Sequence, residues 1–333
     1  MRRVATIATT FGVALGIVTW LVATSWGEAA VAKGRELYPH RAIIEVIDKA
    51  ARRRPAVVWI GDSTLMDLTS QGYPWILHDK HLAPLGAWSA NLYAKGFDVF
   101  GYFTVMERVL DLGPQVVVLI AHLRLFAPAG GTRGFSDLAA LLPAGELPRA
   151  LTLPIAVRGL TAPRLLLVRL LATPWGERTF LMAEGARSNF QEAGFWSILG
   201  PTTVRGTRPR ILFDIANAYT APVTPGHPLL PFLGEAVRMA TARGVRTLVV
   251  VTPIPWEWLN TRHRYDPAAV ERSVGVLRRA VESNGGTLLD LHQALTTAEL
   301  PDVGGHFNPA GREKMAALVW PAIARLLGVA RTE

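Results

Sequence analysis

The sequence contains no cysteine. This absence excludes disulfide bonds, thiolate metal sites and cysteine nucleophiles, so any covalent catalysis has to use another side chain. Charged residues are also scarce, at 18% of the chain, whereas half of the residues are hydrophobic. Such a composition predicts a folded body with a large core and excludes a mainly disordered chain.

No dense basic patch accompanies the net charge of +9. Arginines are scattered along the chain, and no run of lysine and arginine with interleaved aromatic residues occurs. A nucleic acid is therefore not predicted as a partner.

Residues 4–26 are uncharged, and they are numerous enough to cross the roughly 30 Å hydrocarbon layer of a bilayer as a helix. Arg2 and Arg3 precede this stretch, which favours a cytoplasmic N-terminus and an exported remainder. A cleaved signal peptide is the alternative, with residues 30–32 as its small-residue cleavage site. We therefore predict an anchor or signal peptide with its linker over 1–33 and a single extracytoplasmic domain over 34–333, tethered to the cytoplasmic membrane.

Short apolar runs alternate with helical patterns along the predicted domain. The runs predict strands buried in a parallel sheet, at 56–60, 116–120, 247–251 and 287–291. Helices are predicted before these runs and at the end of the chain, at 41–54, 105–112, 233–243, 267–283 and 309–327, the last with Asn308 as its N-cap. The alternation predicts an α/β sheet with crossover helices.

Residues 127–231 contain no clear strand and are predicted to be a mainly helical insertion. Within it, residues 162–175 are unusually apolar for an exposed helix. Three interpretations stay open for this stretch: an extra helix on the core, a lid over the site, or a surface that dips into the bilayer.

The tripeptide Gly61-Asp62-Ser63 directly follows the first predicted strand. Ligands of parallel α/β sheets bind outside the carboxyl ends of the strands, so Ser63 is expected at the site. A serine hydroxyl becomes a useful nucleophile only beside a base and oxyanion donors. A candidate base, His306, stands just before the last helix, together with Asp302, whose carboxylate would orient the imidazole.

When the Gly61-Asp62-Ser63 motif and the motif with Asp302 and His306 are considered together, the sequence resembles the SGNH, or GDSL-type, hydrolase superfamily. This superfamily includes membrane-anchored members that modify cell-envelope polymers. Ser63 matches the family nucleophile and His306 the family base. The resemblance covers roughly residues 55–327 and implies a three-layer α/β/α fold of flavodoxin-like kind. It also implies that backbone N–H groups of the nucleophile and of a glycine contribute to the oxyanion hole. Ser63 and Gly96 are the candidates, with an ordinary turn glycine as the alternative for Gly96.

The sequence departs from the family pattern at two places. The family places an asparagine after the strand at 116–120, whereas this chain continues with Ala121 and His122. Either His122 replaces the asparagine by donating through a ring N–H, or this oxyanion donor is missing. The family usually places the Asp three residues before the catalytic His, whereas Asp302 lies four residues before His306. Asp290, at the end of the last predicted strand, is the alternative orienting acid.

Two further residues are predicted to contact substrate. Arg124 is a candidate for holding an anionic group, although a surface salt bridge is an alternative. Trp256, after the strand at 247–251, is a candidate platform for a sugar ring, although packing under a loop is an alternative. His78 and His81 lack an accompanying carboxylate-rich motif, so no metal site is predicted, and no cofactor is predicted either.

These observations together predict an extracytoplasmic serine esterase or O-acyltransferase. Acyl esters of cell-envelope glycans, above all acetyl esters by analogy with the family, are the expected substrates, with envelope-modification proteins as candidate partners. The alternatives are a lipid esterase and a catalytically degenerate SGNH-like binding or scaffold protein.

Overall fold

The computed structural model describes residues 16, 27–32, 41–65, 72–93, 97–126, 147–152, 163, 166, 182, 219–300 and 306–329. The predicted membrane span, apart from Gly16, lies outside this set, as do Gly96, Asp302, most of the predicted insertion and the side chain of Ser63. None of the described helices is both long and apolar enough to span a bilayer.

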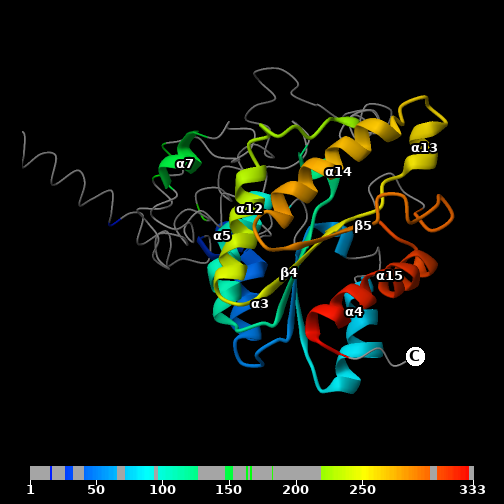
Figure 1. Cartoon of the computed structure of the whole chain (residues 1–333). Coiled ribbons are helices and arrows are strands. Elements are labelled where there is room, and N and C mark those ends of the chain that lie inside the picture. Colours follow the sequence, from blue (N-terminus) through cyan, green and yellow to red (C-terminus); the bar gives the residue numbers. More distant parts are fainter. Residues whose placement is uncertain are drawn as a thin grey trace, which may run out of the picture.

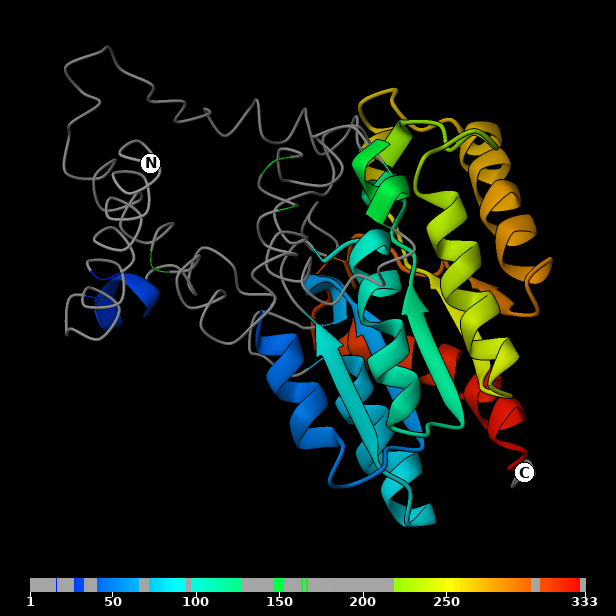
Figure 2. The same ribbon diagram turned by 90° about the vertical axis from the view of Figure 1, so that its left-hand side faces the viewer.

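Five parallel strands form one sheet in the order β2-β1-β3-β4-β5. Their bounds are Val57–Gly61 (β1), Ser89–Tyr93 (β2), Val116–Ile120 (β3), Arg246–Val251 (β4) and Thr287–Asp290 (β5). The arrowheads of β2 and β3 point to the same edge in Figure 2. This strand order is the flavodoxin-like one, as predicted.

Helices cover both faces of the sheet (Figure 1). The longer ones are Arg41–Ala50 (α3), Val99–Asp111 (α5), Leu230–Ala242 (α12), Pro267–Glu282 (α14) and Pro309–Leu327 (α15). Shorter ones are Tyr73–Leu77 (α4), Leu147–Thr152 (α7) and Trp256–Asn260 (α13), with the turns Ser63–Leu65 (η1), His78–Leu82 (η2), Ala83–Leu85 (η3) and Leu123–Phe126 (η4).

Two hydrophobic cores separate the three layers. Side chains of β1 alternate between them, because successive residues of a strand point to opposite faces. Val58 and Ile60 join the core under α3, α5, α12 and α14, whereas Val57 and Trp59 join the core under α4 and α15. The three-layer α/β/α architecture predicted from the sequence is therefore confirmed.

Helix bounds differ from the predictions at a few ends. The first predicted helix stops at Ala50, and Arg54 has a positive φ of 48° in the turn that leads into β1. Helix α5 begins six residues before its predicted start, with the carboxylate of Asp98 accepting from the Gly101 N–H at 2.9 Å. The bounds of α15 agree with the prediction, and Asn308 caps it by accepting from the Gly311 N–H at 2.9 Å.

Candidate active site

The strand order reverses between β1 and β3, and this reversal defines the candidate site. From β1 the chain moves outward to β2, then returns to place β3 on the other side of β1. Crossovers on either side of such a point leave a crevice at the carboxyl ends of the two strands, where ligands of open α/β sheets bind. Ser63 begins η1 two residues after β1, and His122 follows β3 by two residues.

Gly61 allows the end of β1 to lie against the end of β3. A Cβ at this position would meet Cγ1 of Ile120 at 2.7 Å and Cδ1 of Leu65 at 2.8 Å. Both distances are shorter than real Cβ contacts, so a larger residue would push η1 away from β3. The glycine of the Gly-Asp-Ser turn is thus explained by packing.

Asp62 shapes the turn that presents Ser63. One carboxylate oxygen, Oδ1, accepts from the Thr64 N–H at 3.0 Å and from the Thr64 hydroxyl at 2.7 Å. The other oxygen, Oδ2, lies 3.5 Å from a guanidinium nitrogen of Arg124, while the Asp62 side chain is only 1% exposed. Because Arg124 lies in η4, this ion pair links the loops that follow β1 and β3.

His122 is fully buried, and both of its ring nitrogens have partners. Nδ1 accepts from the Arg124 N–H at 3.3 Å, which places the ring proton on Nε2, 3.1 Å from the Tyr219 hydroxyl. Burial lowers the pKa of His122 well below its usual value, and the nearby charges of Arg124 and His306 lower it further. A neutral ring is suited to donating a hydrogen bond, but Nε2–H would have to leave Tyr219 to reach an oxyanion. His122 as oxyanion donor stays a prediction.

His306 lies within electrostatic range of His122, because a charge on His306 contributes to the lowered pKa of the His122 ring. The adjacent Phe307 is buried and packs edge-on against Tyr73, with ring centroids 6.0 Å apart. Burial raises the pKa of Tyr73, and the charge of Asp62 raises it further, so this ring also lies within electrostatic range of the residue before Ser63.

Residues 291–308 connect β5 to α15 and include His306, and the described residues 291–300 at the start of this connection are tied to the segment after β4. The Ile254 N–H donates to the His292 carbonyl at 2.9 Å, and the Trp256 indole N–H donates to the Leu295 carbonyl at 2.9 Å. The Thr297 hydroxyl donates to the Glu257 carboxylate at 2.6 Å. These contacts fix the first half of the loop.

The two predicted substrate contacts have structural partners. Trp256 is half-buried and supports the loop 291–308 through its indole N–H. The Arg124 guanidinium is 19% exposed and pairs with Asp62. Roles of either residue in substrate binding stay predictions, as do the roles of Gly96 and Asp302.

The structure adds one residue that the sequence reasoning missed. His292 lies in the loop after β5, and its Nδ1 is 2.8 Å from Asp290 Oδ1. Burial raises the pKa of Asp290, but hydrogen bonds from the His292 ring and backbone outweigh it and hold that pKa below its usual value. Asp290, the alternative partner considered for His306, thus orients His292. The spacing Asp-x-His at the end of a predicted strand was the available signal.

A cavity of about 460 Å³ lies between α12 and α14, away from this site. Its lining includes Leu230, Gly234, Val276 and Asn284, and none of the predicted catalytic residues. The candidate site is therefore located by strand topology and side-chain chemistry and not by this cavity. Residues 66–71 and 301–305, which are near Ser63 and His306 in the sequence, are not among those described.

No protein-family model and no curated protein matches the sequence. Among solved structures, a putative acylhydrolase from Bacteroides fragilis is 13% identical, with a TM-score of 0.40, covering 84% of this chain and 94% of its own. An acetylxylan esterase from Geobacillus stearothermophilus is 12% identical, with a TM-score of 0.41 and coverages of 83% and 96%. A lipase/acylhydrolase from Enterococcus faecalis is 13% identical, with a TM-score of 0.38 and coverages of 84% and 98%. Likenesses at this level do not assign an activity, so the function is argued from the site.

Proposed function

We propose that this chain is a serine ester hydrolase or O-acyltransferase of the SGNH type, with Ser63 as nucleophile and His306 as general base. The observation that carries the proposal is the reversal of strand order between β1 and β3. It brings the backbone of Ser63, the ion pair of Asp62 with Arg124, and the buried His122 ring to one edge of the sheet. A charge on His306 contributes to the lowered pKa of that ring, which supports a place for His306 nearby.

In the proposed reaction, the Ser63 hydroxyl oxygen attacks the ester carbonyl carbon while His306 accepts the hydroxyl proton. The C–O bond to the leaving alcohol then breaks, and the imidazolium of His306 returns the proton to that alcohol. Asp302 orients His306, and the N–H groups of Ser63 and Gly96 hold the oxyanion. The acyl group remains on Ser63 until a second acceptor removes it.

The acceptor decides between two activities. Attack by water gives an esterase, and attack by a carbohydrate hydroxyl gives an acyltransferase. We place the protein at the cytoplasmic membrane, anchored by residues 4–26, with its domain outside the cytoplasm. Acyl esters, above all acetyl esters, of envelope glycans are then the proposed substrates, and lipid esters are the alternative because residues 162–175 are strongly apolar. Envelope-modification proteins are the proposed partners in the transferase case.

A binding or scaffold role is favoured by one observation. The position that the family fills with an asparagine holds His122, whose ring is engaged with Tyr219. Loss of one oxyanion donor typically removes about 2.7 to 4 kcal/mol of transition-state stabilisation. A scaffold would retain the site's architecture without turnover.

The test uses the full chain, purified in a mild detergent, with p-nitrophenyl acetate and a fluorophosphonate probe. The wild type should hydrolyse the ester and acquire the probe, and Ser63→Ala should lose both. Ser283→Ala is the matched control, because Ser283 is exposed at the end of α14, where its hydroxyl donates to the Arg279 carbonyl. A folded wild type that neither turns over nor reacts would overturn the enzyme proposal in favour of a scaffold.

A further inference from the structure

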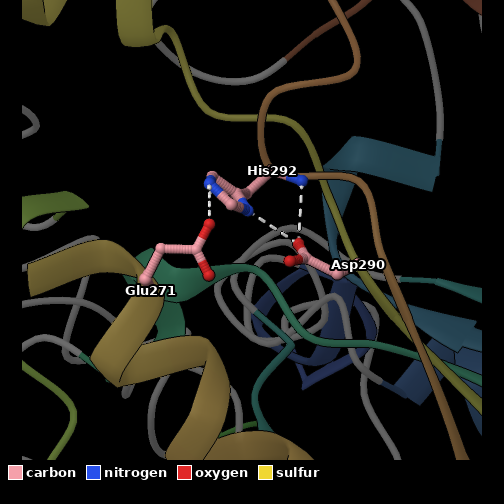
Figure 3. Close-up of side chains that lie close together, drawn as sticks. All are labelled: Glu271, Asp290 and His292. Atoms are coloured by element: carbon pink, nitrogen blue, oxygen red, sulfur yellow. Dashed lines mark hydrogen bonds and ion pairs between the residues drawn. The ribbon is translucent and has the colours of Figure 1, made fainter. Parts of the chain in front are cut away.

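A cluster of three metal-ligating side chains lies at the carboxyl end of β5, apart from the candidate active site. Glu271 projects from α14, Asp290 ends β5, and His292 follows it in the loop 291–308 (Figure 3). One ligand atom from each residue lies within 4.8 Å of the others. Strands in a sheet are about 4.8 Å apart, so β5, three strands from β1, lies about 14 Å from it.

Asp290 fixes the orientation of the His292 ring. Its Oδ1 accepts from Nδ1 at 2.8 Å and from the His292 backbone N–H at 3.1 Å. With the ring proton on Nδ1, the lone pair of Nε2 is directed to the opposite side, toward α14. A histidine that binds a metal ion through one ring nitrogen usually donates a hydrogen bond from the other ring nitrogen to a carboxylate. Asp290 and His292 have this arrangement.

The buried ring nitrogen Nε2 of His292 provides separate support for a ligand at this cluster. The residue is 4% exposed, and Nε2 has no hydrogen-bond partner within the described part of the chain. A buried polar atom without a partner carries a free-energy cost, which a ligand would remove. Glu271 Oε1 lies 3.7 Å from this nitrogen, too far for a hydrogen bond. Two donors on one tetrahedral zinc ion, each about 2.1 Å from it, are about 3.4 Å apart. The observed gap therefore needs only a small adjustment to hold an ion.

We propose that Nε2 of His292 and the carboxylate of Glu271 bind a divalent transition-metal ion, with Asp290 as the outer partner of the histidine. One imidazole and one carboxylate suit Zn²⁺ and its neighbours better than Mg²⁺ or Ca²⁺, which prefer sites made of oxygen ligands only. Water completes the coordination. The bound ion joins α14 to residues 291–300, so its role is to fix the start of this connection.

The competing explanation is a metal-free contact, in which Nε2 of His292 and the Glu271 carboxylate face each other with no ion between them. The two explanations differ in what removal of the Glu271 charge does to metal binding, and this difference sets the experiment.

The experiment uses the untagged full chain, stripped with a chelator and titrated with ZnCl₂ alone, with bound zinc measured by equilibrium dialysis. The wild type should bind one equivalent of zinc. Glu271→Gln should bind zinc at least about tenfold more weakly, because it lacks one of the two proposed ligands. Glu282→Gln is the control on the same helix. Its carboxylate is exposed and pairs with Arg278, so its zinc affinity should match that of the wild type.

Glu271 is exposed, so Glu271→Gln should fold, whereas His292→Gln alters a buried residue. Thermal unfolding with and without ZnCl₂ provides a second readout, in which zinc should raise the Tm of the wild type and of Glu282→Gln but not of Glu271→Gln. Ser63→Ala should bind zinc like the wild type, which separates this site from the proposed hydrolase. Absence of zinc binding, or equal affinities in Glu271→Gln and Glu282→Gln, would overturn the proposal.

Discussion

The Arg124 guanidinium lies 3.5 Å from the Asp62 carboxylate, which is 1% exposed. This ion pair joins the loop after β1, where Ser63 stands, to the loop after β3, where His122 stands. Its partners are two residues that the sequence separates by about sixty positions, and the parallel sheet makes them neighbours.

Breaking this pair should leave a buried charge without compensation. We expect Arg124→Met to lower the free energy of unfolding by about 3 kcal/mol, measured by denaturant titration. The same substitution in an Asp62→Asn background should cost less than about 1 kcal/mol, because no buried carboxylate then remains. Additive effects in this double-mutant cycle would show that the two side chains do not interact.

Gly61→Ala should destabilise the protein through steric overlap. The added methyl would lie 2.7 Å from Ile120 Cγ1 and 2.8 Å from Leu65 Cδ1, so we expect a loss of about 1 to 3 kcal/mol. Gly226→Ala is the control, because nothing lies within 4 Å of the Cβ that this substitution would add. Equal unfolding midpoints for the two variants would contradict the close approach of β1 to β3.

The N-cap carboxyl of α5 should make stability depend on pH. Burial raises the pKa of Asp98 from 3.8 to about 7, against the opposing effect of backbone N–H groups. Well below pH 3.8 the carboxyl is protonated in both states. As pH rises toward 7, the unfolded chain releases this proton while the folded chain keeps it, so this contribution to stability is lost.

Asp98→Asn keeps a capping oxygen but does not titrate. The free energy of unfolding of the variant should therefore rise relative to the wild type between pH 4 and 7, by at most about 4 kcal/mol at 1.36 kcal/mol per pKa unit. Any constant offset from the amide cancels in this comparison. Parallel stability curves across the window would show that burial does not perturb Asp98.

Trp256→Phe separates loop support from sugar stacking, because it keeps an aromatic ring and removes the N–H that bonds to the Leu295 carbonyl. If the tryptophan supports the loop that carries His306, kcat should fall about fivefold with KM nearly constant, for a hydrogen bond worth about 1 kcal/mol. Trp258→Phe is the control, since that ring lies under the Arg262 guanidinium at 4.1 Å. If kcat is unchanged in Trp256→Phe and KM is raised in Trp256→Leu, the results would favour a role of Trp256 in stacking against a sugar ring.

The absence of cysteine provides a direct test of membrane topology. Ser283 is exposed at the end of α14, so Ser283→Cys introduces the single thiol of the chain. A membrane-impermeant maleimide should label this variant in osmotically shocked cells whose cytoplasmic membrane is intact, with the cysteine-free wild type as the blank. Labelling only after lysis would place the domain in the cytoplasm and reject the proposed orientation.

Local sequence pattern predicted the elements that are apolar throughout or clearly capped. Strand β3 and helix α15 have the predicted bounds, because one is a run of β-branched and aliphatic residues and the other begins at Asn308 and Pro309. Strand β2 was missed because its sequence, Ser89 to Tyr93, includes Ala90 and Asn91, residue types that are depleted in strands. Burial of Ser89 and Ala90 depends on packing against β1, which a local pattern does not contain.

The candidate site was predictable only in part for the same reason. Ser63 and His306 are predicted from short motifs at a strand end and before a helix, and their catalytic roles stay predictions. The Tyr219 contact of His122 joins residues 97 positions apart, and the ion pair of Arg124 with Asp62 depends on the strand order. Such contacts arise from tertiary structure and leave no local signal.

The opposite edge of the sheet has a practical consequence. Because every strand is parallel, the loops that lead into β3 and β4 lie at the amino-terminal edge, where the Arg243 guanidinium pairs with Asp111 at 2.6 Å. Asp111 is exposed there. A fluorophore, a crosslinker or a coupling to a sensor chip at this position would leave the carboxyl-terminal edge of the sheet unobstructed, so the protein can be immobilised for ligand screening without blocking the proposed sites.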